Sequence, residues 1–432
     1  MRGLSSLFVI LFGMALTGLV HDASAASPAD LCVVGTQATT TVASANALQS
    51  ALSQAGPGTT IVVKAGNYSG DFTLSKSGNA SKPITIRAGG QVTFINSEFT
   101  LQGSYAVLTG MTFDNGMVTI QGNHNRVTRN VFKNGKPGGN TSKLHSAVHT
   151  EGAAQYNRID HNEVLKWQRR AIRNTKVRSG TKGNRFDHNY LHDLKGPWGN
   201  SGEAFQVGTG PAEHSLTPAT IIEYNLVDGH ELEGEVVSLK SIGNTVLGNT
   251  FMNAPKGNVT TRISSNNKLI NNTLINLMSM RIYADDNEVI GNEFINTDFE
   301  VRSGDCLVTE LLVKNSQYKG GHPAARNTLV VSNQFSNGNI ILGKKGTGNP
   351  SFDRTFPAEN TILIANKGAE VVVSGSVKGT KNRTSYSGEI GKPIRMELSQ
   401  VGPRAADPVC DGGEPPVMSL PPNDLKVVIA RP

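Results

Sequence analysis

The stretch Asn125-Arg-Val-Thr-Arg-Asn130-Val-Phe132 decides the fold, because it recurs as Asn157-Arg-Ile-Asp-His-Asn162-Glu-Val164 and as Asn184-Arg-Phe-Asp-His-Asn189-Tyr-Leu191. The pattern continues with Asn249, Asn272 and Asn292 as its second asparagine, and Asn225 is a related position. The second asparagines therefore follow one another at irregular steps of 32, 27, 36, 24, 23 and 20 along the sequence. A repeat of this length, built from short strands, is typical of a parallel β-solenoid.

The register of the repeat predicts how successive coils stack. Asparagine would lie on asparagine and apolar residue on apolar residue, so that the inward side chains form one continuous core. A β-sandwich would explain the alternation but not the asparagine register, and a propeller would need a period of about 40 to 50 residues with aromatic signatures. We therefore predict an all-β protein, a right-handed parallel β-helix. The amphipathic stretch 44–55 is expected to form an N-terminal helix that caps the open end of the core.

The composition of the 432 residues agrees with many short strands and corners. The 47 glycines tolerate tight turns, which disfavours helical bundles and doubly wound folds. A hydrophobic content of 37% with 17% charged residues excludes a disordered polyelectrolyte and a membrane bundle. The net charge of +7 favours an anionic partner. Nucleic acid is disfavoured as that partner, because scarce aromatic residues leave only charge in its favour.

The N-terminal stretch 1–25 has the features of a signal peptide. Arg2 is followed by an apolar run over 4–20 and by the cleavage-site pattern Ala23-Ser24-Ala25. An uncleaved anchor helix is the alternative. No later stretch approaches the roughly 18 to 20 apolar residues of a membrane span. The mature protein is therefore predicted to be secreted or periplasmic and not attached to a membrane.

The remaining chain divides into a β-helix catalytic domain over 26–402 and a proline-rich tail over 403–432. Three cysteines, Cys32, Cys306 and Cys410, are too few for a disulfide scaffold. One bridge and one free thiol are expected, without an indication of which pair. The oligomeric state is not indicated.

The densest polar cluster is Glu231-Leu-Glu233-Gly-Glu235, preceded by Gly199-Asn200-Ser-Gly-Glu203. Because residues i and i+2 of a strand share a face, Glu233 and Glu235 are expected to point the same way. Two close carboxylates need a counter-charge. Calcium binds carboxylates together with an amide oxygen such as that of Asn200. The cluster therefore predicts a calcium site, with a solvated acidic strand edge as the alternative.

Two basic residues follow, Lys240 and Arg262. Their separation along the sequence equals about one coil, so they are expected side by side on neighbouring coils. A lysine between an arginine and a divalent cation is disfavoured as the ammonium, which suits a general base. A pair of exposed basic residues is the alternative. The offset between Glu235 and Lys240 is odd, so a bend must lie between them if both face one groove.

These residues carry a resemblance to a known family. The chain resembles polysaccharide lyase family six, which contains alginate lyases and chondroitinase B on a right-handed parallel β-helix. The resemblance extends to about Asn296 and lies in the runs Lys82-Pro-Ile-Thr-Ile-Arg87-Ala, Leu108-Thr-Gly-Met-Thr-Phe113, Gly199-Asn200-Ser-Gly-Glu203, Ile222-Glu-Tyr-Asn225-Leu, Glu233-Gly-Glu235-Val-Val-Ser-Leu-Lys240-Ser241 and Arg262.

The resemblance implies a role for individual positions. Asn200, Glu233 and Glu235 match the calcium ligands of the family, and the ion would bind the uronate carboxylate. Lys240 matches the base that removes the C5 proton, and Arg262 matches the arginine that stabilises the developing enolate. An arginine is hard to deprotonate, so the resemblance leaves the proton donor open. Arg281 looks like a family arginine that holds substrate, with an exposed strand arginine as the alternative.

The chain also departs from the family pattern. Ile263-Ser264 stands where His-Gly often follows the catalytic arginine, and Gln206 stands where an arginine is common. We expect Gln206 to contact substrate, and Arg173 and His149 to compensate for the missing side chains. Further candidates in the same long coils are Lys143, His145, Arg169, Arg170 and Lys176.

The sequence thus predicts an enzyme that cleaves a uronate-containing anionic polysaccharide, alginate first, by calcium-assisted β-elimination. A C5-epimerase and a non-catalytic polysaccharide-binding solenoid are the alternatives, and chondroitin or dermatan sulfate is an alternative substrate. A solenoid glycoside hydrolase would need paired acids. Asp285-Asp286 is the one tempting pair, and it is interpreted as a turn because it directly precedes the repeat at Asn287.

Overall fold

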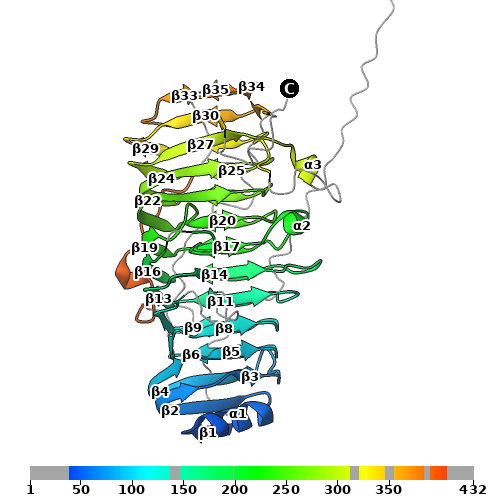
Figure 1. The fold of residues 1–432 in the computed structure, drawn as a ribbon, viewed down its shortest axis with the longest axis vertical. Helices are drawn as coiled ribbons and strands as arrows, with labels where there is room; N and C mark the ends of the chain where they lie inside the picture. The colour runs from blue at the N-terminus through cyan, green and yellow to red at the C-terminus, as the bar shows by residue number, and fades with distance from the viewer. Residues whose placement is uncertain are drawn as a thin grey trace, which may run out of the picture.

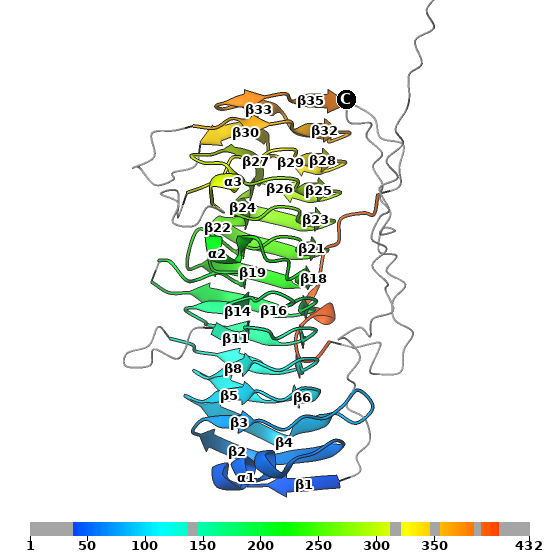
Figure 2. The same ribbon diagram turned by 90° about the vertical axis from the view of Figure 1, so that its right-hand side faces the viewer.

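The computed structural model describes residues 38–136, 146–197, 199–311, 321–345, 355–383 and 390–405. Over these residues the chain winds into a parallel β-helix whose coils stack along the longest axis of the molecule, as predicted (Figures 1 and 2). The predicted signal peptide, Cys32, Cys410 and the tail beyond 405 lie outside the described residues, as do Lys143 and His145. None of the described helices is long and apolar enough to cross a membrane.

Each complete coil contributes one strand to each of three parallel ladders, which we name after the consecutive strands β11, β12 and β13. The β11 ladder contains β3 (Phe72–Leu74), β5 (Glu98–Leu101), β8 (Met117–Ile120), β11 (Ser146–Glu151), β14 (Arg170–Thr175), β17 (Phe205–Val207), β20 (Val237–Leu239), the second halves of β22 (Thr250–Thr261) and β24 (Thr273–Ile282), β27 (Asp298–Ser303), β30 (Ile340–Lys345) and β33 (Val371–Val373).

The β12 ladder contains β1 (Ala38–Val42), the first halves of β2 (Thr59–Ser69) and β4 (Ile84–Ile95), β6 (Ala106–Thr109), β9 (Arg126–Thr128), β12 (Arg158–Asp160), β15 (Arg185–Asp187), β18 (Ile221–Glu223), β21 (Thr245–Leu247), β23 (Lys268–Ile270), β25 (Glu288–Ile290), β28 (Leu329–Val331), β32 (Ile362–Ile364) and β35 (Lys381–Arg383). The β13 ladder contains the second halves of β2 and β4, then β7 (Thr112–Asp114), β10 (Val131–Lys133), β13 (Glu163–Leu165), β16 (Tyr190–Lys195), β19 (Leu226–Glu231), the first halves of β22 and β24, β26 (Glu293–Ile295) and β29 (Gln334–Ser336). A separate pair joins β31 (Ala358–Glu359) to β34 (Val377–Lys378).

Stacked asparagines hold the coils in register at the bends that flank the β12 ladder. The Nδ2 group of Asn225 donates to Oδ1 of Asn249 at 2.9 Å, and Asn249 donates in turn to Asn272 at 3.0 Å. This row runs without interruption from Asn130 to Asn366. Each Oδ1 also accepts the backbone N–H of the asparagine in the preceding coil, so one amide satisfies several buried backbone groups. The predicted stacking of asparagine on asparagine is therefore confirmed.

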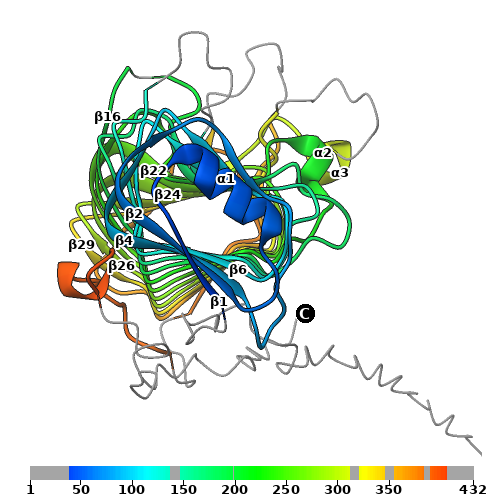
Figure 3. The ribbon, with the colours of Figure 1, turned by 90° about the horizontal axis from the view of Figure 1, so that it is seen from below.

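The apolar side chains of all three ladders meet in one core. Phenylalanines stack from coil to coil, for example Phe94 on Phe113 with ring centroids 5.1 Å apart and Phe113 on Phe132 at 4.9 Å. Helix α1 (Ala45–Gln54) lies across the N-terminal end of this core and buries Leu48 and Leu52 against it (Figure 3). The predicted capping helix is present.

Two features lie outside the regular coils. The short helices α2 (Pro211–His214) and α3 (Val308–Leu311) belong to insertions that project from the same side of the stack (Figures 1 and 3). Residues 390–405, with the 3₁₀ turn Leu398–Gln400, run back along the outside of the β12 ladder (Figure 2). In this strap, Met396 N–H donates to Thr250 at 2.7 Å, and Ala405 accepts from Arg129 at 2.9 Å.

Candidate active site

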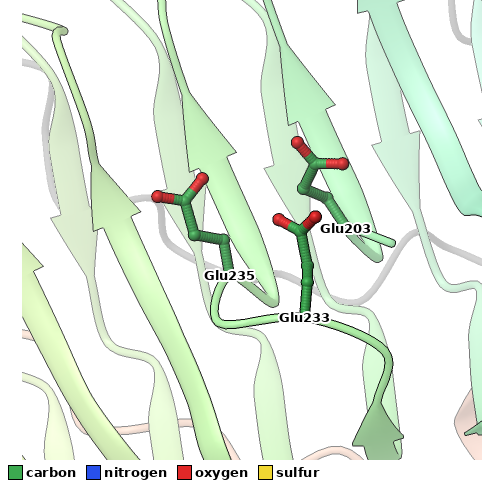
Figure 4. A group of neighbouring side chains, drawn as sticks. All are labelled: Glu203, Glu233 and Glu235. Carbon is green, nitrogen blue, oxygen red and sulfur yellow. The ribbon is translucent and has the colours of Figure 1, made fainter. Parts of the chain in front are cut away.

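Three glutamates converge on the outer face of the β11 ladder (Figure 4). Glu203 lies just before β17 on one coil, and Glu233 and Glu235 lie just before β20 on the next coil. One carboxylate oxygen from each lies within 4.8 Å of the others. All three are buried, with Glu203 fully inaccessible. This acidic triad has no counterpart elsewhere among the described residues.

The local backbone explains why Glu233 and Glu235 face the same way. They lie in the bends that lead into β20, not within a strand as the i, i+2 argument assumed. Backbone N–H groups of Ser201 and Gly202 hold Glu233, the latter at 2.9 Å, and the Ser238 hydroxyl holds Glu235 at 2.6 Å. The bend required by the odd offset between Glu235 and Lys240 is present at Val236.

The charges of the triad are unequally compensated. Burial raises the pKa of Glu233 to about 7, and the neighbouring Glu203 and Glu235 act in the same direction. Burial also disfavours ionised Glu235, but Arg262 and Lys240 outweigh it and lower the pKa of that carboxyl. Glu203 accepts from Arg170 Nε at 2.9 Å and from Lys240 Nζ at 3.3 Å. The triad is thus short of positive charge around Glu233.

The predicted basic residues surround this triad. Arg262 Nη1 donates to Glu235 Oε1 at 2.9 Å, and Arg281 Nη2 lies 3.5 Å from the same oxygen. Lys240 is bound to Glu203 instead, with its side chain 12% exposed. Ser238, Thr260 and Arg281 pair in register on consecutive strands of the β11 ladder. Lys240 and Arg262 each follow two residues later on the first two of these strands, so they also lie on neighbouring coils. The structure therefore brings Lys240, Arg262, Arg281, Glu233 and Glu235 into one cluster.

A pocket of about 320 Å³ opens beside this cluster. Acidic, basic and neutral residues line it together: Gly199, Asn200, Glu233, Gly234, Glu235, Arg262, Arg281, Tyr283, Arg302 and His322. Burial and the nearby Arg262 lower the pKa of His322 to about 4, so this ring is neutral at pH 7. Most groups that face the pocket are therefore charged or polar, as a site for an anionic sugar requires.

The donor set fits a hard divalent cation. Carboxylates of Glu203, Glu233 and Glu235 supply oxygens from two coils, and Asn200 lines the same pocket. A bound cation would also supply the counter-charge that Glu233 lacks. The residues that would hold it are thus the predicted Asn200, Glu233 and Glu235 together with Glu203.

Three predicted substrate contacts lie elsewhere on the β11 ladder. Gln206 pairs with Ser238 in register, Arg173 with Gln206, and His149 with Arg173, so they form a row that leads away from the triad. None of them lines the pocket, and all three are at most 8% exposed. Arg173 Nη2 lies 3.2 Å from His149 Nδ1, and His149 Nε2 lies 2.8 Å from Thr175 Oγ1. Together these residues form a buried polar row on the β11 ladder that does not line the pocket.

The acid pair considered for a hydrolase lies apart from the pocket. Asp285 forms an ion pair with Arg326 at 2.5 Å, and Asp286 adopts a left-handed φ of 57° in a bend. The interpretation of this pair as a turn agrees with the structure.

Cys306 is buried in the insertion that carries α3.

Four functional candidates received no role in the sequence analysis: Glu203, Tyr283, Arg302 and His322. The sequence did contain a signal for two of them. The interval from Lys240 to Arg262 nearly repeats from Arg262 to Tyr283 and from Tyr283 to Arg302, so the coil spacing pointed to Tyr283 and Arg302. Glu203 and Glu233 lie one long coil apart. His322 comes from an insertion that breaks the repeat, and no spacing points to it.

Comparisons with known proteins agree with this fold. No curated protein matches the chain. Among solved structures, a family 6 polysaccharide lyase from Pseudopedobacter saltans is 19% identical, with a TM-score of 0.69 over 85% of this chain and 99% of that chain. A mannuronic acid specific family 6 lyase from human gut microbiota is 19% identical, with a TM-score of 0.64 over 84% and 96% of the two chains. A family 6 alginate lyase in complex with a trisaccharide is 17% identical, with a TM-score of 0.68 over 86% and 97%.

The structural likenesses establish the shared fold, and the family follows from the sequence model. The model of the family described as chondroitinase B matches residues 42–375, which is well over half of the chain. This range includes every member of the acidic triad and every residue that lines the pocket. The protein therefore belongs to the chondroitinase B family and is a polysaccharide lyase of family six.

Proposed function

We propose that the protein cleaves alginate by calcium-assisted β-elimination and releases oligosaccharides with a C4–C5 double bond. The observation that carries this proposal is the acidic triad in contact with Lys240 at 3.3 Å and Arg262 at 2.9 Å. Elimination next to a carboxylate needs a neutralised carboxylate, a base for the C5 proton and charge stabilisation for the enolate. The lining of the pocket provides residues for the first and third needs, and Lys240, which contacts the triad at Glu203, provides the base.

Each residue has a stated part in the proposed reaction. Calcium held by Asn200, Glu203, Glu233 and Glu235 would neutralise the uronate carboxylate and so acidify the C5 proton. Lys240 accepts that proton as the general base. Arg262, whose pKa is raised by Glu235 despite its burial, stays cationic and stabilises the enolate. Arg281, with its side chain 20% exposed beside Arg262, holds the substrate carboxylate.

Alginate is favoured over a sulfated substrate by what lines the pocket. Arg262, Arg281 and Arg302 offer guanidinium groups near the triad, but Arg262 and Arg281 contact Glu235, and Arg302 is paired with Glu300. Little basic charge is thus left for a sulfate in addition to a carboxylate. Alginate lyases are also among the solved structures with this fold, one of them bound to a trisaccharide. Dermatan sulfate is the alternative substrate to be tested.

The test is the ultraviolet absorbance of the unsaturated uronate product. Purified protein would be assayed on alginate, polymannuronate, polyguluronate and dermatan sulfate, with and without a chelator. A rise on alginate that the chelator abolishes and added calcium restores is expected. A rise on dermatan sulfate alone would replace the substrate. Altered mannuronate content without absorbance would identify a C5-epimerase, and binding without either change would identify a binding solenoid.

We also propose that residues 1–25 are removed on export, which leaves a secreted or periplasmic enzyme. Export would place the protein where polymeric alginate occurs. N-terminal sequencing of the protein recovered from the expressing cells is expected to begin at Ala26. A start at Met1 in the cytosolic fraction would contradict this proposal.

A further inference from the structure

The two ends of the β-helix are finished differently. At the N-terminal end, helix α1 covers the core with Leu48 and Leu52. At the other end, β33 and β35 are the last strands of the β11 and β12 ladders (Figures 1 and 2). Among the described residues, no strand pairs with the outer edge of either one. An open last coil exposes apolar surface and unpaired backbone groups, so this end needs a cover.

The valines at this end occupy core positions but are exposed. Val371 and Val373 pair in register with Ile340 and Leu342, which are core residues with 1% exposure. The same register turns both valines toward the core, yet they are 42% and 65% exposed. Val373 is the most exposed large apolar side chain in the described part of the chain. The core is therefore open at β33.

The backbone of β33 has a free side as well. The carbonyl of Glu370 accepts from the N–H of Ile340 at 2.9 Å, and the N–H of Ser374 donates to the carbonyl of Leu342 at 2.9 Å. Backbone groups of successive residues in a strand point to opposite sides, so the two exposed valines direct theirs away from β30. The strand thus offers apolar side chains and a free edge together, as strand addition requires.

We propose that residues 425–430 of the tail, which lie outside the described residues, add to β33 as a further strand and close this end of the core. The segment is Leu425-Lys-Val-Val-Ile-Ala430, with β-branched residues at three consecutive positions. It contains no proline or glycine, in contrast to the proline-rich sequence before it. Its composition is therefore that of a strand.

The alternation of the segment fits a cover with one apolar face. Residues i and i+2 of a strand share a face, so Leu425, Val427 and Ile429 would lie on the core side and stack on the exposed valines of β33. Lys426 would lie on the opposite side, toward solvent. The added strand would repeat the packing of Ile340 and Leu342 on β33 one coil further along the stack.

The tail is long enough to reach this end. The strap ends at Ala405, which bonds to Arg129 just after β9. Nine pairings of the β12 ladder lead from β9 to β35, a distance of about 43 Å at about 4.8 Å per strand. The 20 residues from Ala405 to Leu425 include five prolines and can span about 62 Å at about 3.1 Å per residue. The excess allows the tail to cross from the β12 ladder to β33.

Other occupants fit this end less well. Residues 384–389, which follow β35 directly, have Tyr386 as their one large apolar side chain. A second copy stacked end to end would bring together two ends that are rich in exposed basic residues, and like charges repel. These residues are Lys367, Lys378, Lys381 and Arg383.

Amide hydrogen exchange of isotopically labelled valine tests the proposal. In the full chain the N–H groups of Val371 and Val373 should be protected. In a chain that ends at Pro422, both should exchange about tenfold faster or more. The N–H of Val372 faces β30 and should change little. A synthetic peptide of residues 423–432, added to the shortened chain, should restore the protection.

Two substitutions in the full chain test the face that the segment presents. Val427→Lys places a charge on the core side and should remove the protection of the β33 amides as truncation does. Val428→Lys, the matched control, changes the next residue on the opposite face and should keep it. The amide of Val259, in the fully buried middle of the stack, should stay protected in every variant, which separates loss of the cover from unfolding.

Three results would overturn the proposal. The first is equal exchange of the Val371 and Val373 amides in the full and shortened chains. The second is an equal effect of Val427→Lys and Val428→Lys. The third is protection that survives truncation and rises with protein concentration, which would assign the free edge of β33 to a second copy of the chain.

Discussion

Replacement of Glu233 by glutamine should stabilise the metal-free protein. The pKa of about 7 for Glu233, against 4.5 for an ordinary glutamate, corresponds to about 3 kcal/mol of unfavourable free energy once the buried carboxyl is ionised. Because the folded-state pKa lies above the unfolded-state value, the penalty begins as the pH rises past 4.5 and is complete above about 7. Glu233→Gln removes the charge but keeps the shape, so it should gain most of this free energy at alkaline pH.

The assay is urea unfolding in the presence of a chelator, at pH 8 and at pH 5. We expect Glu233→Gln to exceed wild type by about 3 kcal/mol at pH 8 and by less than about 1 kcal/mol at pH 5. Glu231→Gln is the matched control, since Glu231 pairs with Lys195 at the surface with its side chain 58% exposed. That control should show no comparable change.

Calcium should reverse the order of the two proteins. At a thousandfold excess over the dissociation constant, a ligand stabilises the folded state by about 4.1 kcal/mol, which exceeds the variant's advantage of about 3 kcal/mol. Wild type should gain this increment, and Glu233→Gln should gain little of it. A variant no more stable than wild type at pH 8 without metal would refute the reasoning, as would a difference that does not change with pH.

Three further substitutions test the site and the stack. Lys240→Ala should abolish product absorbance and leave the melting temperature near that of wild type. Lys268→Ala, at an exposed strand position, is the control and should keep full activity. An active Lys240→Ala enzyme would contradict the role of Lys240 as the base. Arg281→Ala should raise KM about tenfold or more with a smaller change in kcat, because it loses a charge-assisted contact made in the ground state; a loss confined to kcat would argue against a binding role. Asn249→Ala should lower the free energy of unfolding by about 3 kcal/mol, because it removes buried hydrogen bonds at 2.8 to 3.0 Å. Asn67→Ala, at an exposed strand position, should cost under about 1 kcal/mol in the same urea titration. Equal effects would mean that the ladder is not what holds the register.

The fold was predictable because one residue type marks the consecutive coils from Asn130 to Asn366. A ladder asparagine such as Asn249 bonds backbone groups of the preceding coil and the asparagine side chain of the following coil. This requirement repeats whatever the length of the loop between two ladder asparagines. The irregular steps therefore did not obscure the stack. The loops themselves could not be predicted, since no repeat constrains the insertions that carry α2 and α3.

The candidate site was predictable where it follows the coil spacing. Lys240 and Arg262 are neighbours because their strands pair in register. Glu233 and Glu235 converge for a different reason from the one expected, because bends and not strand alternation turn them into the pocket. Gln206 lies on the ladder as expected but is covered, since spacing places a residue on a face without showing what packs over it. His322 illustrates the limit, because only the three-dimensional path of its insertion brings it to the pocket.

The strap formed by residues 390–405 changes how the molecule is expected to assemble during synthesis. In a simple solenoid each coil contacts only its neighbours, so the early coils can mature before the later ones exist. Here Arg129 bonds to Ala405, 276 residues later, and Met396 and Val401 complete an apolar cluster on the middle coils. These coils keep uncovered apolar surface until nearly the whole chain has been made. Ribosome-bound chains that stop before residue 390 should consequently bind chaperones that recognise exposed apolar surface for longer than the finished protein does.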